Sequence, residues 1–306
     1  MQLFVEAIKH INFGGDVARL FHGRGGCYPG AEHLCLDWYA PVILLTSFKP
    51  LNDDALAVIT ETIEQRWYET HEQGSLNLVF QYRAGGETHT QIIVGAVPEP
   101  HQVCENGAWF QVHLLKGQNH GLFLDMKAGR QWVREHSTGK KILNLFAYTC
   151  GFSVAALQGK ADSVVNIDMS KPALSIGQQN HRLNGLSEGA RFLGHDIFKS
   201  WGKLTKLGPY DLIITDPPSN QKGSFVATKD YARLLKRLPS LLANDGDILL
   251  CLNAPELSLA FLKEQVAEYS PQLSLKEQLA NPSVFEDVDP NKALKVLRYK
   301  IDSETV

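Results

Sequence analysis

The stretch "YDLIITDPPSNQKGSF" (210–225) joins an apolar run to an acid and two prolines. The apolar run predicts a buried strand, and Asp216, Pro217 and Pro218 follow directly at its end. Each proline fixes its own φ angle and disfavours the helical conformation in the residue before it. A stiff loop at the carboxyl end of a strand is typical of the ligand site in an open α/β sheet. An ordinary tight turn would use the same residues, so the rest of the chain decides between the two.

The segment after residue 119 shows strand and helix patterns in alternation. Each of the first five predicted strands precedes a segment with helical spacing, and this predicts a doubly wound, mostly parallel α/β sheet. The last two strands have no helix between them, which predicts an antiparallel pair at one edge. The predicted strands cover 141–148, 163–168, 190–196, 210–216, 246–253, 273–280 and 293–301.

The first part of the chain has a different pattern, in which short strands surround one predicted helix. The helix covers 52–67, where apolar residues recur every three or four positions. This pattern predicts a small α+β domain, so we expect two domains, 1–118 and 119–306. The strands expected in the first domain are 39–48, 76–83, 88–95 and 108–115.

The composition is typical of a globular protein, with 44% hydrophobic and 21% charged residues among 306. The net charge is −3, but its distribution is uneven. Residues 1–120 hold 7 Lys+Arg and 13 Asp+Glu, whereas residues 121–306 hold 23 and 20. A polyanion would therefore meet the C-terminal part of the chain. No apolar run is long enough to span a bilayer, and the start of the sequence predicts no signal peptide.

The five cysteines are scattered, and no two of them form a C-x-x-C pair. An odd number without the spacing of metal ligands is typical of a reduced, cytoplasmic protein, and it predicts no metal site.

Polar residues follow four of the predicted strands, and the carboxyl ends of parallel strands meet at one edge of a sheet. Asp168 ends the second strand, 17 positions after Gly151, where an acid can accept hydrogen bonds from both hydroxyls of a ribose. Asp196 ends the third strand, and Asp216 ends the fourth. An acid at one strand end is often only a helix cap, but polar residues at four strand ends in register favour a ligand site.

The first of these strand ends distinguishes between two kinds of nucleoside cofactor. An NAD enzyme would need a G-x-G-x-x-G turn for the pyrophosphate, but Gly151 is the one glycine in the turn that starts at Tyr148. S-adenosylmethionine has a ribose and an adenine but no phosphate, so it fits the pattern better. Its methionine part would cross Tyr148–Gly151, with Asp168 at the ribose and Asp196 near the adenine.

With these motifs the sequence resembles the S-adenosylmethionine-dependent large-subunit (23S) rRNA base methyltransferases, which include cytosine-C5 and guanine-N7 enzymes. The resemblance implies a Rossmann-like methyltransferase domain preceded by a small α+β module. Many members carry an RNA-binding domain before this module, and we expect no such domain in this sequence. The matching motifs are "GLFLDMKAGR" (121–130), "LNLFAYTCGFSVAAL" (143–157), "VVNIDMSKPAL" (164–174), "NHRLNGL" (180–186) and "YDLIITDPPS" (210–219).

The resemblance also implies the residues of the site. Those expected to bind the cofactor are Asp125, Arg130, Phe146, Tyr148, Thr149, Gly151, Asp168, Met169, Asp196, Ile197 and Asp216. Those expected around the acceptor base, with a catalytic role, are Asp216, Pro217, Pro218 and Asn253. The sequence departs from the family at Cys150, where a glycine with positive φ is usual, and at Asn220, where a phenylalanine is usual.

The atom that accepts the methyl group depends on the cysteines. Carbon 5 of cytosine becomes nucleophilic only after a thiolate adds at carbon 6. The carbon-methylating relatives carry that cysteine just after the fifth strand, but here the position falls on Ala254, beside Asn253. Cys251 lies three residues earlier in an apolar run and resembles a buried core residue. We therefore favour a nitrogen acceptor, with cytosine carbon 5 and Cys251 as the alternative.

Basic residues follow the Asp-Pro-Pro motif, and we expect them to contact the phosphates of RNA, in particular 23S rRNA. Lys222 comes first, and the rest have the spacing of one helix face. Phe225 and Tyr231 would either stack on a base or belong to the core. The residues with helical spacing are Lys229, Arg233, Lys236 and Arg237.

Two other functions stay open at this point. One is methylation of a small molecule or a protein side chain, which the acidic first half of the chain would suit. The other is a non-catalytic protein that binds S-adenosylmethionine, for which Cys150 and Asn220 are the only arguments. No membrane partner is expected, and the sequence leaves the oligomeric state open.

Overall fold

The computed structural model describes residues 1–71, 74–221 and 223–301 and divides into two compact units. The first consists of Met1–Asp125 and Pro282–Pro290, and the second of Met126–Asn281 and Asn291–Val306. The division therefore falls seven residues after the expected one, and a segment from the C-terminal half belongs to the first unit. The carbonyl of Gly25 accepts a hydrogen bond of 2.8 Å from the Val288 N–H, which fixes this segment on the first unit.

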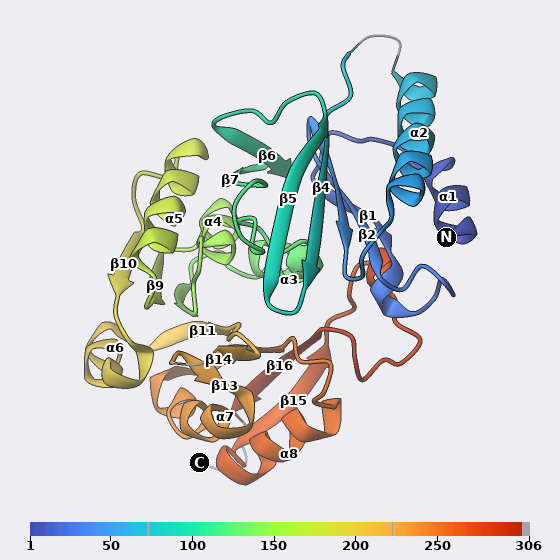
Figure 1. Ribbon diagram of the computed structural model, residues 1–306. Coiled ribbons are helices and arrows are strands. Elements are labelled where there is room, and N and C mark those ends of the chain that lie inside the picture. The colour runs from blue at the N-terminus through green and yellow to red at the C-terminus, as the bar shows by residue number, and fades with distance from the viewer. Residues whose placement is uncertain (72–73, 222, 302–306) are drawn as a thin grey trace. The chain divides into compact units, whose positions relative to one another are not determined.

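The first unit contains a five-stranded sheet in the order β1-β2-β3-β4-β5 and a separate hairpin of β6 and β7 (Figure 1). The predicted strands and helix are present, but β1, β2, β6 and α1 were not predicted. The strands are β1 (Ala18–His22), β2 (Leu34–Tyr39), β3 (Val42–Ser47), β4 (Leu78–Ala84), β5 (Glu87–Val94), β6 (His101–Glu105) and β7 (Ala108–Val112); the helices are α1 (Gln2–Ile8) and α2 (Asp53–Thr70), with the short turns η1 (Gly23–Gly25) and η5 (Ser283–Phe285).

The second unit contains a seven-stranded sheet in the order β10-β9-β8-β11-β14-β16-β15. Neighbouring strands from β10 to β14 are parallel, whereas β16 is antiparallel to both β14 and β15. The predicted doubly wound sheet and its antiparallel edge pair are thus confirmed, with the last strand inserted between β14 and β15. The strands are β8 (Lys141–Leu145), β9 (Ser163–Asp168), β10 (Ala190–Gly194), β11 (Tyr210–Thr215), β14 (Leu242–Leu252), β15 (Leu273–Gln278) and β16 (Lys295–Ile301).

Helices cover both faces of this sheet. Successive residues of β14 face opposite sides of the sheet. Leu250 packs with the core around α6, α7 and α8, whereas Cys251 packs with α3 and α4. The connections at the carboxyl ends of the strands include the short elements η3, β12 and β13. The elements are α3 (Lys127–Glu135), α4 (Gly151–Gln158), α5 (Lys171–Leu183), η3 (Ile197–Lys199), α6 (Trp201–Leu207), β12 (Asn220–Gln221), β13 (Phe225–Val226), α7 (Ala227–Leu235), η4 (Leu238–Leu241) and α8 (Leu259–Tyr269).

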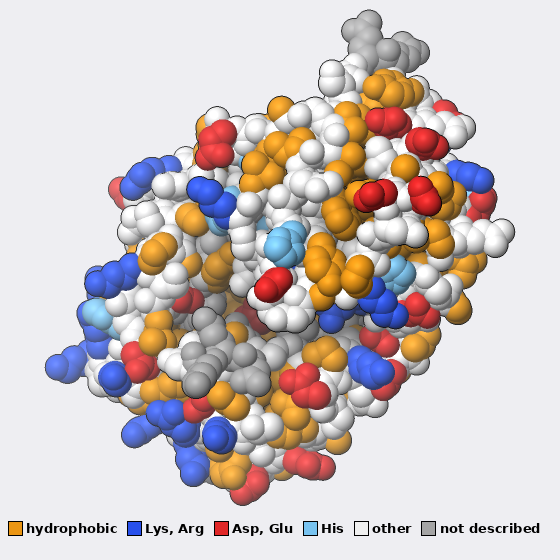
Figure 2. Space-filling model, in the orientation of Figure 1, with side chains coloured by type: hydrophobic (Ala, Val, Ile, Leu, Met, Phe, Trp, Pro, Cys, Tyr) orange, Lys and Arg blue, Asp and Glu red, His pale blue; other side chains and the backbone are white. Residues whose placement is uncertain are grey.

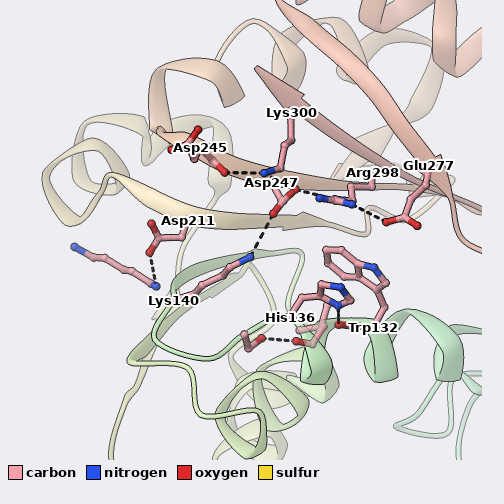
Figure 3. Close-up of polar contacts among 12 residues, drawn as sticks. Trp132, His136, Lys140, Asp211, Asp245, Asp247, Glu277, Arg298 and Lys300 are labelled. Carbon is pink, nitrogen blue, oxygen red and sulfur yellow. Dashed lines mark hydrogen bonds and ion pairs between the residues drawn. The ribbon is translucent and has the colours of Figure 1, made fainter. Parts of the chain in front are cut away.

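A cluster of charges lies at the amino ends of the parallel strands (Figure 3). The buried carboxylate of Asp247 on β14 lies 2.8 Å from Nε of Arg298, 3.3 Å from Nζ of Lys140 and 3.9 Å from Nζ of Lys300. Arg298 also binds Glu277 on β15, with an N–O distance of 3.0 Å. The cluster joins β14, β16, β15 and the start of β8, so it fixes the antiparallel strands to the parallel part of the sheet.

Candidate active site

The candidate site lies along the edge of the second sheet where its parallel strands end. Their registers show that the ends coincide, because Gly194 pairs with Asp168, and Thr215 pairs with both Leu145 and Leu250. The residues that follow each strand therefore lie beside those that follow its neighbours.

The turn after β8 has an unusual backbone. Phe146, Tyr148 and Cys150 have positive φ angles of 57°, 45° and 63°. Cys150 thus adopts the left-handed conformation that a glycine would adopt at this position, at a cost of about 1–2 kcal/mol for a residue with a Cβ. The alternation leaves Phe146 and Tyr148 partly exposed, whereas Ala147 and Thr149 are buried.

Helix α5 supports this turn. The side-chain amide of Asn180 donates to the Thr149 carbonyl over 3.0 Å, and both residues are buried. Gly177 on the same helix packs against Cys150 so closely that an added Cβ would lie 2.5 Å from the sulfur. A strained turn persists only where its surroundings fix it, and these contacts supply the support.

Asp168 holds the turn from the next strand. Its carboxylate accepts a hydrogen bond from the backbone N–H of Tyr148 over 2.9 Å and another from the N–H of Ser170 over 2.7 Å. A carboxylate has about four acceptor positions, and Asp168 is partly exposed. It therefore retains capacity for two further donors, such as the hydroxyls of a ribose.

A buried chain of polar side chains lies beneath the turn and was not predicted from the sequence. Asn144 on β8 donates to Asn166 on β9 over 2.9 Å, and Asn166 donates to the hydroxyl of Ser153 on α4 over 2.9 Å. The Ser153 hydroxyl lies 2.9 Å from Nε2 of His181 on α5. Burial lowers the pKa of His181 more than its hydrogen bond to the Gly177 carbonyl raises it, so the neutral ring can accept from Ser153.

The end of β10 places Asp196 as a cap. Its side chain accepts a hydrogen bond of 2.9 Å from the Phe198 N–H at the start of η3, and it lies 3.7 Å from Nζ of Lys199. Ile197 is 3% exposed and packs in the core. Met169, after β9, is 49% exposed and is free to contact a ligand on the edge.

The loop after β11 is joined to the loop after β14. The hydroxyl of Ser219 donates to the backbone carbonyl of Asn253. Pro217 is buried, and Asp216 and Pro218 are partly exposed, whereas Asn253 is exposed. The contact brings together the four residues for which the sequence predicts a place around the acceptor base.

Two aromatic residues near this loop belong to the core. Phe225 is 1% exposed and Tyr231 is 0% exposed, and their ring centroids are 5.2 Å apart. The Tyr231 hydroxyl donates to the carbonyl of Cys251, and burial raises the pKa of Tyr231. The structure therefore excludes stacking of these two rings on a base, which was one of the two interpretations.

The basic residues after the loop do not share one helix, contrary to the prediction. Helix α7 ends at Leu235, so Lys236 caps it and Arg237 precedes η4. The reason is Pro239, which has no N–H to donate to the Leu235 carbonyl in a continued helix. Lys229, Arg233, Lys236 and Arg237 are nevertheless all exposed. Lys222 lies outside the described residues, and the side chain of Asn220 is not described.

The first predicted motif falls at the boundary of the two units. Asp125 is the last residue of the first unit, in η2 (Leu124–Met126), and Arg130 lies on α3 in the second, where it is 5% exposed.

Among the described residues, no group of three or more His, Cys, Asp or Glu could hold a metal ion. None of the helices in the described ranges is long and apolar enough to cross a membrane.

The fold and the strand-end residues define a class of protein, and comparison with known proteins identifies it. The chain belongs to the S-adenosylmethionine-dependent methyltransferase family, whose model matches residues 18–300. This match confirms the enzyme family, the fold class and the cofactor that the sequence predicted.

Particular relatives are rRNA methyltransferases by name. Ribosomal RNA large subunit methyltransferase I of Aeromonas salmonicida (strain A449) is 32% identical over 192 residues, 62% of this chain and 48% of that protein. Ribosomal RNA large subunit methyltransferase K/L of Psychrobacter sp. (strain PRwf-1) is 41% identical over 156 residues, 48% of this chain and 19% of that protein. The chain thus spans about half the length of the type I relative that it matches, and less of the K/L relative.

Solved structures share the fold. SMU.776 in complex with SAH has a TM-score of 0.84 at 23% identity, and the match covers 98% of this chain and 81% of that chain. A SAM-dependent methyltransferase from Agrobacterium tumefaciens has a TM-score of 0.68 at 20% identity, covering 95% and 92%. At these identities the likeness concerns the fold alone.

Proposed function

We propose that the protein transfers the methyl group of S-adenosylmethionine to a nitrogen of a base in large-subunit rRNA. The observation that carries the proposal is a pair of contacts at the edge of the second sheet. Asp168 accepts a hydrogen bond from the turn after β8, and Ser219 joins the Asp-Pro-Pro loop to Asn253. The rRNA substrate is supported by the names of the relatives. An rRNA substrate would place the reaction in the cytoplasm.

The donors and acceptors of this edge fit S-adenosylmethionine. Asp168 has spare acceptor positions for the ribose, and Asp196, which is 27% exposed at its side chain, is available for the adenine amino group. The turn at Tyr148–Gly151 would border the methionine part, and it lacks the glycines of a pyrophosphate site. When bound, the cofactor would supply a sulfonium methyl group to an in-line nucleophile, with the neutral thioether as the leaving group.

The task of the protein in such a displacement is alignment of the acceptor with the methyl group and sulfur. Pro217 and Pro218 restrict the loop after β11, and the contact between Ser219 and Asn253 joins that loop to β14. Asp216 and Asn253 supply polar groups to orient the edge of a flat base.

A nitrogen acceptor is supported by the burial of both cysteines in the second unit. Cys251 is 0% exposed and packs with Leu249 and Val296 on the α3 side of the sheet. Cys150 is also 0% exposed, and burial raises the pKa of its thiol. A carbon-5 mechanism needs an accessible thiolate, whereas a nitrogen lone pair needs none.

The test of the proposed function is a methylation assay with labelled S-adenosylmethionine and deproteinised 23S rRNA from a strain that lacks the gene. We expect label in one base, and nuclease digestion with mass spectrometry identifies the methylated atom. Label in a protein or a small molecule, with none in the RNA, would contradict the proposal. Cofactor binding without transfer to any of these would favour the non-catalytic alternative.

Replacing Asp168 with alanine should weaken S-adenosylmethionine binding about ten- to a hundredfold, because hydrogen bonds to a charged acceptor contribute about 1.5–3 kcal/mol. The change also removes the acceptor for the Tyr148 N–H. Titration calorimetry measures the affinity, and Asp162→Ala, at an exposed acid before β9, is the control. An affinity equal to that of the control would remove Asp168 from the cofactor site.

We further propose that Lys229, Arg233, Lys236 and Arg237 contact rRNA phosphates. Reversing Arg233 and Lys236 to glutamate should weaken binding to 23S rRNA and flatten its dependence on salt, because each phosphate contact releases counterions. Filter binding at several salt concentrations measures both quantities. An unchanged salt slope would show that these side chains are only solvated.

A further inference from the structure

The positive charge of the C-terminal part is concentrated in one segment. Residues 190–241 contain nine Lys and Arg against four Asp and Glu, whereas the rest of 121–306 contains 14 against 16. This segment includes both the end of β10 with η3 and α6, and the Asp-Pro-Pro loop with α7. The excess of positive charge therefore extends beyond the basic residues that follow the Asp-Pro-Pro loop.

Three lysines in the first half of this segment point to solvent. Lys199 on η3 is 85% exposed at its side chain, and Lys203 and Lys206 on α6 are exposed. Lys203 lies 3.3 Å from Nε2 of His195, and neither Lys203 nor Lys206 forms an ion pair with the described part of the chain.

Two of the acids in the segment are bound by neighbours. Asp230 is 14% exposed at its side chain, and it accepts from the Val226 N–H and from Arg233. Asp211 accepts from the backbone N–H of Lys141 over 2.8 Å. A third acid, Asp196, lies 3.7 Å from Nζ of Lys199, so the uncompensated charge of the first half rests on Lys203 and Lys206.

A direct contact joins the two halves of the segment. The guanidinium carbon of Arg233 on α7 lies 4.0 Å from the ring centroid of Phe198 on η3. Figure 2 shows Lys and Arg side chains gathered at the lower left of the molecule, where Figure 1 places α6 and α7. We call the seven residues of this region the basic surface: Lys199, Lys203, Lys206, Lys229, Arg233, Lys236 and Arg237.

The basic surface adjoins the candidate site through the chain itself. Its first half begins directly after Asp196, and its second half follows the loop that starts at Asp216. Phosphates bound on both halves would therefore lie next to the edge where the base is methylated.

We infer that η3 and α6, which carry the first half of the basic surface, bind the phosphates of the substrate RNA together with the second half on and after α7. The inference rests on the proposed function and adds Lys199, Lys203 and Lys206 to the residues after the Asp-Pro-Pro loop. A surface with such an excess of Lys and Arg suits a polyanion. Under the proposed function that polyanion is the substrate RNA.

The test compares two double charge reversals in the whole protein. Lys203→Glu with Lys206→Glu should weaken binding of deproteinised 23S rRNA about tenfold or more. It should also make the plot of log affinity against log salt shallower by about 0.7 per lysine for a single-stranded contact. Lys160→Glu with Lys263→Glu, at exposed positions of the same unit outside the segment, is the matched control and should change neither quantity beyond the nonspecific effect of charge.

The outcomes separate this inference from the proposed function. We call the protein with Lys203→Glu and Lys206→Glu the α6 variant. If the wild type methylates rRNA but the α6 variant behaves as the control does, the inference is wrong and the proposed function stands. If the wild type neither binds nor methylates rRNA, both are wrong. Loss of binding to phosphatidylserine vesicles in the α6 variant, with unchanged RNA binding, would assign the surface to a membrane and overturn the inference. Calorimetry with S-adenosylmethionine, unchanged in the α6 variant, checks that the site is intact.

Discussion

Replacing Asp247 with alanine is expected to lower the free energy of unfolding by about 3–5 kcal/mol. The carboxylate is 5% exposed at its side chain, and Arg298, Lys140 and Lys300 surround it. Without it three cations would remain close together at the amino ends of the strands, and of these Arg298 would keep its ion pair with Glu277. Removing one partner of a buried ion pair is costly because the other charge stays buried and unpaired. The cations are about a quarter to a third exposed, so the lower part of this range is expected.

Urea unfolding, followed by circular dichroism and by tryptophan fluorescence, measures the change in the free energy of unfolding. We expect the dependence of this free energy on urea concentration to keep its slope. Asp245→Ala is the matched control, because Asp245 lies on the same strand, is exposed, and contributes only its backbone carbonyl to Lys300. Asp247→Asn, which keeps the shape and loses the charge, should fall between the two. A loss for Asp247→Ala no larger than that for Asp245→Ala would show that the cluster contributes little to stability.

The second unit was predictable because its strands are short apolar runs with clear ends. The range of β9 was predicted without error, and α5 shows local signals at both ends, with Pro172 in its first turn and Gly185, at a φ of 67°, after its C-cap. The inner parallel strands β8, β9 and β11 are buried at nearly every residue, so a mainly apolar run identifies each of them. Helix α7 was misjudged because helical spacing alone does not show where Pro239 stops it.

The first unit was harder to predict because its polar residues interrupt the strand patterns. Strand β2 is buried at every residue yet contains Asp37. That carboxylate pairs with Arg19 on β1, and such a partner is visible only in three dimensions. Helix α1 has no side-chain cap to mark its start, so neither element carried a local signal.

The sequence predicts which side chains of the candidate site follow the strands. It does not predict the backbone conformation of the turn after β8. Asp168 and Asp216 could be singled out because polar residues follow several predicted strands at the same edge of the sheet. The left-handed Phe146 and Tyr148 could not be foreseen, because residues with a Cβ avoid that region unless the fold imposes it. Asn166, inside the apolar strand "SVVNID", was a missed signal of the buried polar chain.

Replacing Asp216 with alanine is expected to lower the rate of rRNA methylation about a hundredfold or more. Asp216 lies at the end of β11, where Pro217 and Pro218 stiffen the loop that Ser219 attaches to Asn253. Loss of a positioning contact at the reacting centre misplaces the acceptor, and a shift of about 1 Å can cost about a hundredfold in rate. The rate is measured at saturating S-adenosylmethionine and rRNA, with calorimetry to confirm that the cofactor still binds.

Cys251→Ser is the matched control, because it tests the alternative mechanism at a position near the same edge. If a nitrogen is the acceptor, the variant should keep nearly full turnover, since Cys251 is fully buried and packs against Leu249 and Val296. RNA that contains 5-fluorocytosine should then form no covalent complex, because no thiolate adds at carbon 6. A trapped complex, or a folded but inactive Cys251→Ser, would overturn the nitrogen acceptor and place the protein with the enzymes that methylate cytosine at carbon 5. Full activity of Asp216→Ala would instead remove the Asp-Pro-Pro loop from the acceptor site, whichever atom is methylated.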